Sequence, residues 1–211
     1  MADKEILIFV EGPSDKVFLE AYLYFLEDIP IKNFKVKDVT GKDNLSKRLL
    51  EIEKYDKTLI IFDADKDYES NKKEILSKTQ QKITKEQIFL FPNNQDDGDL
   101  ETLLLEIAKH DEFLKCFEGY LECIKSKEHY KPIKNISKSK WYAYLEVFEL
   151  QNFFKDKRNK NDKKNEEKII IDDKGKIRKE YKEEYEKLKE VIDFNSNSLI
   201  PLKDFLWQFA K

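Results

Sequence analysis

The chain has 211 residues, of which 40% are hydrophobic and 39% are charged, with 15 Phe and 10 Tyr to build a core. This composition excludes a chain that is disordered throughout, and it predicts one ordinary domain with an appendage. The 40 Lys and Arg residues nearly balance the 43 Asp and Glu residues. The net charge therefore gives no general attraction to nucleic acid or anionic lipid, and a polyanionic partner must be bound locally.

The first apolar stretch, residues 6–10, ends at Glu11. It is too short for a signal-peptide core or a membrane span, so we expect a cytoplasmic protein with no membrane partner. Cys116 and Cys123 are seven residues apart in a helical pattern. This spacing puts them on one face two turns apart, too distant for an easy disulfide. We interpret both as reduced packing residues.

Strand and helix patterns alternate through the first half of the chain. Apolar runs bounded by Gly, Pro or charged residues predict strands, and apolar residues at helical spacing predict helices. The predicted strands are 5–10, 34–40, 58–63 and 87–92, and the predicted helices are 14–28 with Ser14 as N-cap, 42–55, 70–83 and 99–110. This order predicts an α/β fold, a Rossmann-like parallel four-stranded sheet flanked by helices.

The second half of the chain has a different character. We expect residues 1–112 to form the α/β core and residues 113–211 to form a mainly helical C-terminal portion. Its segments are two helical stretches at 111–126 and 138–154, a charged mobile loop at 155–168, a possible hairpin at 168–181, and an apolar end at 198–211. Residues from Arg178 onward also suit a helix that ends near Ile192, and the apolar end is suited to packing back on the core.

Acidic side chains follow the first and third predicted strands. Glu11 comes directly after the first strand, and Asp63 and Asp65 occupy alternate positions at the end of the third, in the stretch IIFDADKD. Ligands of parallel sheets bind beyond the carboxyl ends of the strands. Mg²⁺ prefers hard oxygen ligands and is commonly held by one or two carboxylates. The pattern predicts a Mg²⁺ site formed by these residues, whereas a single such Asp is more often an exposed surface acid.

The segments EGPSDKVFLEAYL and IIFDADKD, in this strand–helix order, resemble the Toprim fold shared by topoisomerases, bacterial primases and OLD-family nucleases. The resemblance covers roughly residues 5–110. It implies that Glu11, Asp63 and Asp65 form the site. Glu11 is the candidate general acid or base, provided that crowding by Asp63 and Asp65 raises its pKa. The later stretches LFPNNQDDGDLETLLLEI, SKSKWYAYLEVF and LIPLKDFLWQF are similar to a stand-alone bacterial Toprim-like family of undefined biochemical role.

The resemblance to OLD-family nucleases extends to a second group of acids. It implies that Asp97, Asp99 and Glu101 hold a second ion, and that Lys140 or Lys138 assists. A structural alternative is equally open for Glu101, because negative charge is favoured at a helix N-terminus. The expected ion is Mg²⁺, with Mn²⁺ as a substitute, and the number of ions, one or two, is left open.

The function expected from these residues is metal-dependent phosphodiester hydrolysis of nucleic acid, DNA or RNA. The excess of Lys and Arg in residues 155–168 suits a phosphate backbone, although such runs are more often solubilising loops. One alternative is a non-catalytic Toprim scaffold that acts with a separately encoded ATPase or other partner protein, and another is a small-molecule phosphatase. Strand passage and primer synthesis are disfavoured, because nothing singles out a nucleophilic Tyr and zinc-ribbon cysteines are missing. The chain also has no nucleotide-binding P-loop motif.

Overall fold

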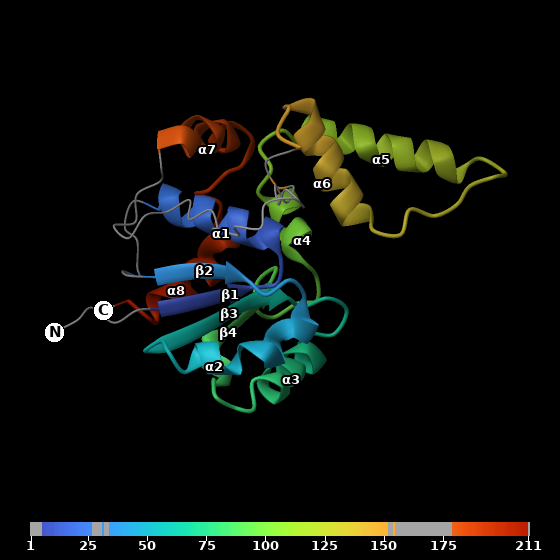
Figure 1. Ribbon diagram of the computed structural model, residues 1–211. Coiled ribbons are helices and arrows are strands. Elements are labelled where there is room, and N and C mark those ends of the chain that lie inside the picture. The colour runs from blue at the N-terminus through green and yellow to red at the C-terminus, as the bar shows by residue number, and fades with distance from the viewer. Residues whose placement is uncertain (1–5, 27–30, 32–33, 152–153, 155–178, 211) are drawn as a thin grey trace, which may run out of the picture.

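The structure is a computed structural model that describes residues 6–26, 31, 34–151, 154 and 179–210. Its centre is a four-stranded sheet in the order β2-β1-β3-β4, in which every neighbouring pair is parallel. The strands are β1 (Ile6–Val10), β2 (Phe34–Asp38), β3 (Lys57–Asp63) and β4 (Ile88–Phe91). The predicted parallel α/β sheet is therefore confirmed (Figure 1).

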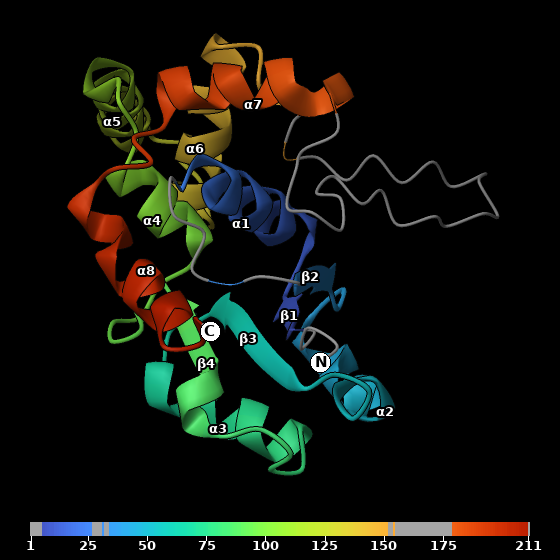
Figure 2. The ribbon, with the colours of Figure 1, turned by 90° about the vertical axis from the view of Figure 1, so that its left-hand side faces the viewer.

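Both faces of the sheet are buried. Alternate residues of β1 enter two separate hydrophobic clusters, Ile6, Ile8 and Val10 on one face and Leu7 and Phe9 on the other. This is the reason that the strand reads as a continuous apolar run. Helices α1 (Pro13–Phe25) and α4 (Leu100–Glu106) cover one face, and α2 (Leu49–Ile52) and α3 (Tyr68–Lys78) cover the other (Figure 2).

The start of α1 differs from the prediction. Its N-cap is Gly12, with Pro13 in the first turn, so the assignment of Ser14 as N-cap is wrong. Pro is favoured in the first helical turn because its missing N–H needs no partner there. The Gly12 N–H is instead satisfied by the side chain of Asp15, at 2.6 Å from N to Oδ2. The helix therefore begins directly behind Glu11.

The predicted helix over 42–55 is shorter and more irregular in the structure. Residues Lys42–Arg48 form a 3₁₀ helix, and the α-helical part is the four-residue α2. Asp, Asn and Ser compete with helical hydrogen bonding through their side chains. Asn44 does so here, because its Nδ2 donates to the carbonyl oxygen of Thr40 at 2.7 Å.

Helix α8 (Ile200–Trp207) packs beside β4, with its buried Phe205 ring centroid 5.4 Å from that of Phe89. Helix α7 (Lys179–Val191) supplies the buried Tyr185 and Leu188 to the same hydrophobic cluster as α1. These segments from opposite ends of the chain thus share one core. The start of α7 also agrees with a helix from Arg178 onward, while the predicted mobile loop 155–168 and the hairpin residues 168–178 lie outside the described residues.

Helices α5 (Asp111–Lys125) and α6 (Ile136–Val147) form an arm that extends away from the sheet (Figure 1). Leu114 is the buried residue of α5. Cys116 and Cys123 are free and exposed, so their interpretation as packing residues is wrong. The helical spacing predicted them on one face, but no pattern in the sequence indicates that this face is exposed. No helix in the described part of the chain is long and apolar enough to cross a membrane.

Candidate metal-binding site

Four acidic side chains meet at the carboxyl end of the sheet. Glu11 follows β1 and Asp63 ends β3, while Asp15 and Glu101 lie in the first turns of α1 and α4. Each of the four has a raised pKa, with burial as the largest cause. We call Glu11, Asp15, Asp63 and Glu101 the carboxylate cluster. Two strands and two helices contribute to it, as expected for the carboxyl edge of a parallel sheet.

The loop between β4 and α4 brings Glu101 to the site. Asp65 and Gly98 form an antiparallel bridge, with N···O distances of 2.7 and 2.8 Å in the two directions. Gly98 has φ of +145°, and a Cβ there would lie 3.0 Å from Cδ of Pro92. A side chain at this position would disturb the bridge, so glycine is needed for the close approach.

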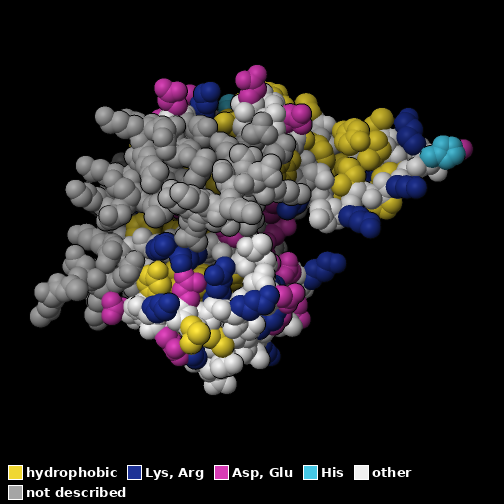
Figure 3. Space-filling model, viewed as in Figure 1, with side chains coloured by type: hydrophobic (Ala, Val, Ile, Leu, Met, Phe, Trp, Pro, Cys, Tyr) yellow, Lys and Arg dark blue, Asp and Glu magenta, His cyan; other side chains and the backbone are white. Residues whose placement is uncertain are grey.

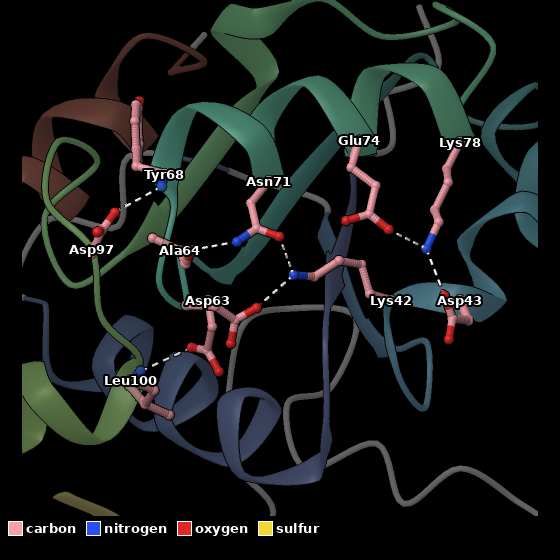
Figure 4. A network of polar contacts seen from close by, with 11 residues as sticks. Lys42, Asp43, Asp63, Ala64, Tyr68, Asn71, Glu74, Lys78, Asp97 and Leu100 are labelled. Atoms are coloured by element: carbon pink, nitrogen blue, oxygen red, sulfur yellow. Dashed lines mark hydrogen bonds and ion pairs between the residues drawn. The ribbon is translucent and has the colours of Figure 1, made fainter.

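Asp63 is held at the start of α4. Its Oδ1 accepts a hydrogen bond from the Leu100 N–H at 2.8 Å (Figure 4). Burial raises the pKa of Asp63 well above its ordinary value, and the carboxylates of Asp15 and Glu11 raise it further. Burial disfavours the charged form of a carboxyl group, and like charges nearby have the same effect. The structure thus assembles several carboxyl groups around Asp63.

Asp15 belongs to the cluster although the sequence analysis did not select it. The side chain is 7% exposed, and its pKa is raised to about 7, first by burial and then by Glu101 and Glu11. The Gly12 N–H and Lys138 act in the opposite direction. The available signal was the position of Asp15 one helical turn after Glu11, which places an acid at the same edge of the sheet.

Glu11 has an unsatisfied oxygen. Its Oε2 is buried and has no hydrogen-bond partner among the residues that the structure describes. Burial raises the pKa of Glu11, Lys42 lowers it, and Asp65 raises it. An unpaired buried carboxylate oxygen costs free energy unless it is protonated or meets a cation. Glu11 is therefore the member of the cluster whose surroundings most clearly call for a further partner.

Glu101 has a lysine partner on α6. Lys138 Nζ lies 3.7 Å from Glu101 Oε1 and lowers the pKa of Glu101, against the larger effect of burial. Lys140 lies elsewhere, because its Nζ is 2.6 Å from Oε1 of Glu118 on α5. Of the two predicted lysines, the structure brings Lys138 to the cluster and places Lys140 in the α5–α6 arm.

Asp65 lies beside the cluster and forms an ion pair. Lys42 donates to Asp65 Oδ2 at 2.7 Å and to Asn71 Oδ1 at 2.6 Å, and Figure 4 shows it lying between α3 and the end of β3. The Lys42 side chain is 12% exposed, whereas that of Asp65 is 55% exposed. Asp65 thus faces solvent more than the clustered carboxylates do.

Asp97 and Asp99 have structural partners instead. Asp97 Oδ1 accepts from the Tyr68 N–H at 2.8 Å at the start of α3. Asp99 is the N-cap of α4, and its Oδ1 accepts from the N–H and hydroxyl of Thr102 at 2.8 and 2.7 Å. A side-chain oxygen that bonds the free N–H groups of a helix start stabilises that helix. Both predicted ligands therefore serve as acceptors at helix starts, although Asp99 lies near enough to Glu101 to raise its pKa.

Within the described residues, no three His, Cys, Asp or Glu side chains are arranged as a ready set of metal ligands. Mg²⁺, however, usually keeps several waters and takes one or two carboxylates. The buried, unpaired Oε2 of Glu11 and the crowding around Asp63 suit such a partial ligand set. The side chains therefore fit a hydrated divalent cation better than an ion enclosed by protein alone.

Comparison with known proteins identifies a family for this chain. The family model described as "Protein of unknown function (DUF3226)" matches residues 5–210. The chain belongs to the DUF3226 family. The matched range includes the carboxylate cluster, the α5–α6 arm and α8. No curated protein and no solved structure matched the sequence.

Proposed function

We propose that this DUF3226 protein binds Mg²⁺, or Mn²⁺ in its place, at the carboxylate cluster and hydrolyses phosphodiester bonds of nucleic acid. The observation that carries the proposal is the buried, unpaired Oε2 of Glu11 beside Asp63, whose pKa is raised by burial and by neighbouring carboxylates. A divalent cation would neutralise this charge. The resemblance of the Glu11 and Asp63–Asp65 segments to the Toprim fold favours nucleic acid as the substrate, which also suits a cytoplasmic protein.

Glu11 and Asp63 are the side chains that would hold the ion. Asp65 could join them if its ion pair with Lys42 opened. One or two ions suit the cluster, and each would supply Lewis-acid stabilisation of phosphate oxygens and a more acidic bound water. The protein would contribute binding and proton exchange. Lys138, 55% exposed at the rim, can contact a phosphate group of the substrate.

Asp15 is the candidate for proton exchange. Its pKa of about 7 leaves it partly protonated at neutral pH, and a general acid or base works best when its pKa lies near the operating pH. Its Oδ2 accepts a hydrogen bond from the Gly12 N–H, and this bond fixes the orientation of the carboxyl group. Glu11, whose pKa is also raised, is the second candidate for this role.

The proposal is tested by cleavage of plasmid DNA and of labelled single-stranded RNA with Mg²⁺, Mn²⁺ or EDTA. We expect metal-dependent cleavage that falls at least about 100-fold in Asp63→Asn, the scale for removing a group that stabilises charge in the transition state. Asp97→Asn is the matched control, because it removes the same charge from a neighbouring loop outside the cluster. Equal activity in Asp63→Asn and wild type would overturn the proposed site.

A second candidate function is that of a non-catalytic scaffold that acts with a separately encoded ATPase or other protein. It is favoured by Lys42 and Lys138, which already pair with Asp65 and Glu101, and by the exposed α5–α6 arm. Isothermal titration with Mn²⁺ distinguishes the two candidates. Absence of binding at millimolar metal would support the scaffold, whereas turnover of an aryl phosphate without nucleic-acid cleavage would indicate a small-molecule phosphatase.

A further inference from the structure

The arm carries an exposed ridge along α5 that no described residue covers. Its members are spaced for one side of a helix and continue into the turn after it, in the order Glu112, Cys116, Gly119, Tyr120, Cys123 and Lys127. Tyr120 is 52% exposed, and the two cysteines are exposed and free. Figure 3 shows hydrophobic side chains gathered over this arm and basic side chains at its tip.

The ridge is complementary to itself when it is reversed. Reading it from the opposite end places Glu112 across from Lys127, Cys116 across from Cys123, and Gly119 across from Tyr120. Opposite charges thus meet at both ends of an antiparallel pair. A two-fold axis requires this property, since residue i of one copy contacts residue j of the other and the reverse contact is identical.

The centre of the ridge combines a bulky side chain with an open position. A Cβ built at Gly119 has no other heavy atom within 4 Å, so the surface beside it is empty. The Tyr120 ring lies next to that of Phe117, with centroids 5.9 Å apart, and projects from the same part of the helix. Small residues let two helices approach closely, and a large side chain of one helix fills the space that a small residue of the other leaves.

We propose that two copies of this chain associate through α5 in an antiparallel pair, with Tyr120 of each copy packed over Gly119 of the other. The contact uses one helix per subunit, which is smaller than the roughly 800 Å² per partner of a standard interface. We therefore expect a concentration-dependent monomer–dimer equilibrium. This association is independent of the proposed hydrolytic activity.

Sedimentation velocity over a range of protein concentrations tests the association with charge variants. Lys127→Glu places two acids opposite each other at both ends of the pair, and we expect the dissociation constant to rise at least about tenfold. The double variant Glu112→Lys/Lys127→Glu restores opposite charges at both ends. Its dissociation constant should lie within about threefold of that of wild type. Lys125→Glu is the matched control: it makes the same charge change on the opposite side of α5 and should leave dimerisation unchanged.

Gly119→Leu distinguishes an effect on the dimer interface from an effect on the stability of α5. Leu has a higher helix propensity than Gly, so α5 itself is not weakened, yet the space that receives Tyr120 is filled. We expect the dissociation constant of the dimer to rise at least about tenfold, because the added side chain clashes with Tyr120 of the other copy. The thermal stability of the variant should be unchanged or raised. A Gly119→Leu dimer as tight as wild type would overturn the proposed packing.

Oxidation of the cysteines tests the register. An added copper–phenanthroline oxidant takes the two electrons released as two thiols lose their protons and form a disulfide, so Cys116 of one copy should crosslink to Cys123 of the other. Cys116→Ser and Cys123→Ser should each abolish the crosslinked dimer, because the remaining cysteines lie apart in the antiparallel pair. A monomer at all concentrations, or crosslinking that persists in either single variant, would overturn the proposal.

Discussion

The carboxylate cluster and the loop before α4 are both rich in acids, yet the carboxyl groups of the two sets have different surroundings. Glu11 and Asp63 are crowded among other carboxylates, with an unpaired buried oxygen on Glu11. Asp97 and Asp99 accept hydrogen bonds from free N–H groups at the starts of α3 and α4. Asp63 also accepts a hydrogen bond from the Leu100 N–H at the start of α4, so the two sets differ in how closely other carboxylates surround them and not in whether they bond a helix start.

This difference separates a stabilising carboxylate from one that is available for a ligand. The N–H groups at a helix start have no partner within the helix, so a carboxylate that bonds them removes an existing deficit. A carboxylate that is buried beside other carboxylates carries negative charge that is unfavourable there. Protonation or a bound cation neutralises this charge. The following predictions test whether the two sets differ in this way.

The largest expected effect is on the pH dependence of stability. Burial raises the pKa of Asp15 from 3.8 to about 7, so the folded state keeps a proton that the unfolded state releases between these values. The free energy of unfolding should therefore fall as pH rises through this window, by on the order of 4 kcal/mol for Asp15 alone. Urea denaturation in EDTA from pH 3.5 to 8 measures the change.

Two comparisons sharpen this measurement. Asp15→Asn keeps an oxygen acceptor for the Gly12 N–H and should reduce the slope without abolishing it, because the pKa values of Asp63 and Glu20 are also raised. Asp97→Asn should retain the slope of the wild type. Mg²⁺ should restore stability at pH 8 and have little effect at pH 5, where protons already neutralise the cluster. Stability that stays constant between pH 5 and 7 would contradict the raised pKa values.

A smaller effect is expected at the helix cap. Asp99→Ala removes the acceptor for the N–H and hydroxyl of Thr102 and should lower the free energy of unfolding by about 1 kcal/mol, the usual cost of losing an N-cap. Metal affinity, measured by titration with Mn²⁺, should remain close to that of wild type. A large loss of affinity with unchanged stability would instead make Asp99 a ligand.

The smallest effect concerns the two lysines of α6. Lys138→Met removes a cation from Glu101 and should increase Mn²⁺ affinity by about threefold, within the roughly 0.2–1 kcal/mol range of exposed ion pairs. Lys140→Met removes the same charge from the arm, where Lys140 contacts Glu118, and should leave affinity unchanged. Equal shifts in both variants would show that general charge, and not the contact with Glu101, sets the affinity.

Periodicity in the sequence correctly indicated the four parallel strands, because β1, β3 and β4 are buried on both faces and read as apolar runs. It overestimated the helix over 42–55, which is mostly 3₁₀. It also selected Glu11 and Asp63. It did not select Asp15, because the place of Asp15 in the carboxylate cluster depends on where the first turn of α1 lies beside the sheet. It could not rank Lys138 against Lys140, since both positions are on one helix and their partners come from different elements.

The sequence by itself determined the sheet, its carboxyl edge and the two strand-end acids, because local apolar patterns and chain direction dictate these features. Only the tertiary structure decided which carboxylates crowd together, and that one side of α5 is exposed among the described residues. These outcomes depend on segments that are distant in the chain: the bridge between Asp65 and Gly98 draws α4 toward β3, and burial by several elements changes the proton affinity of each acid.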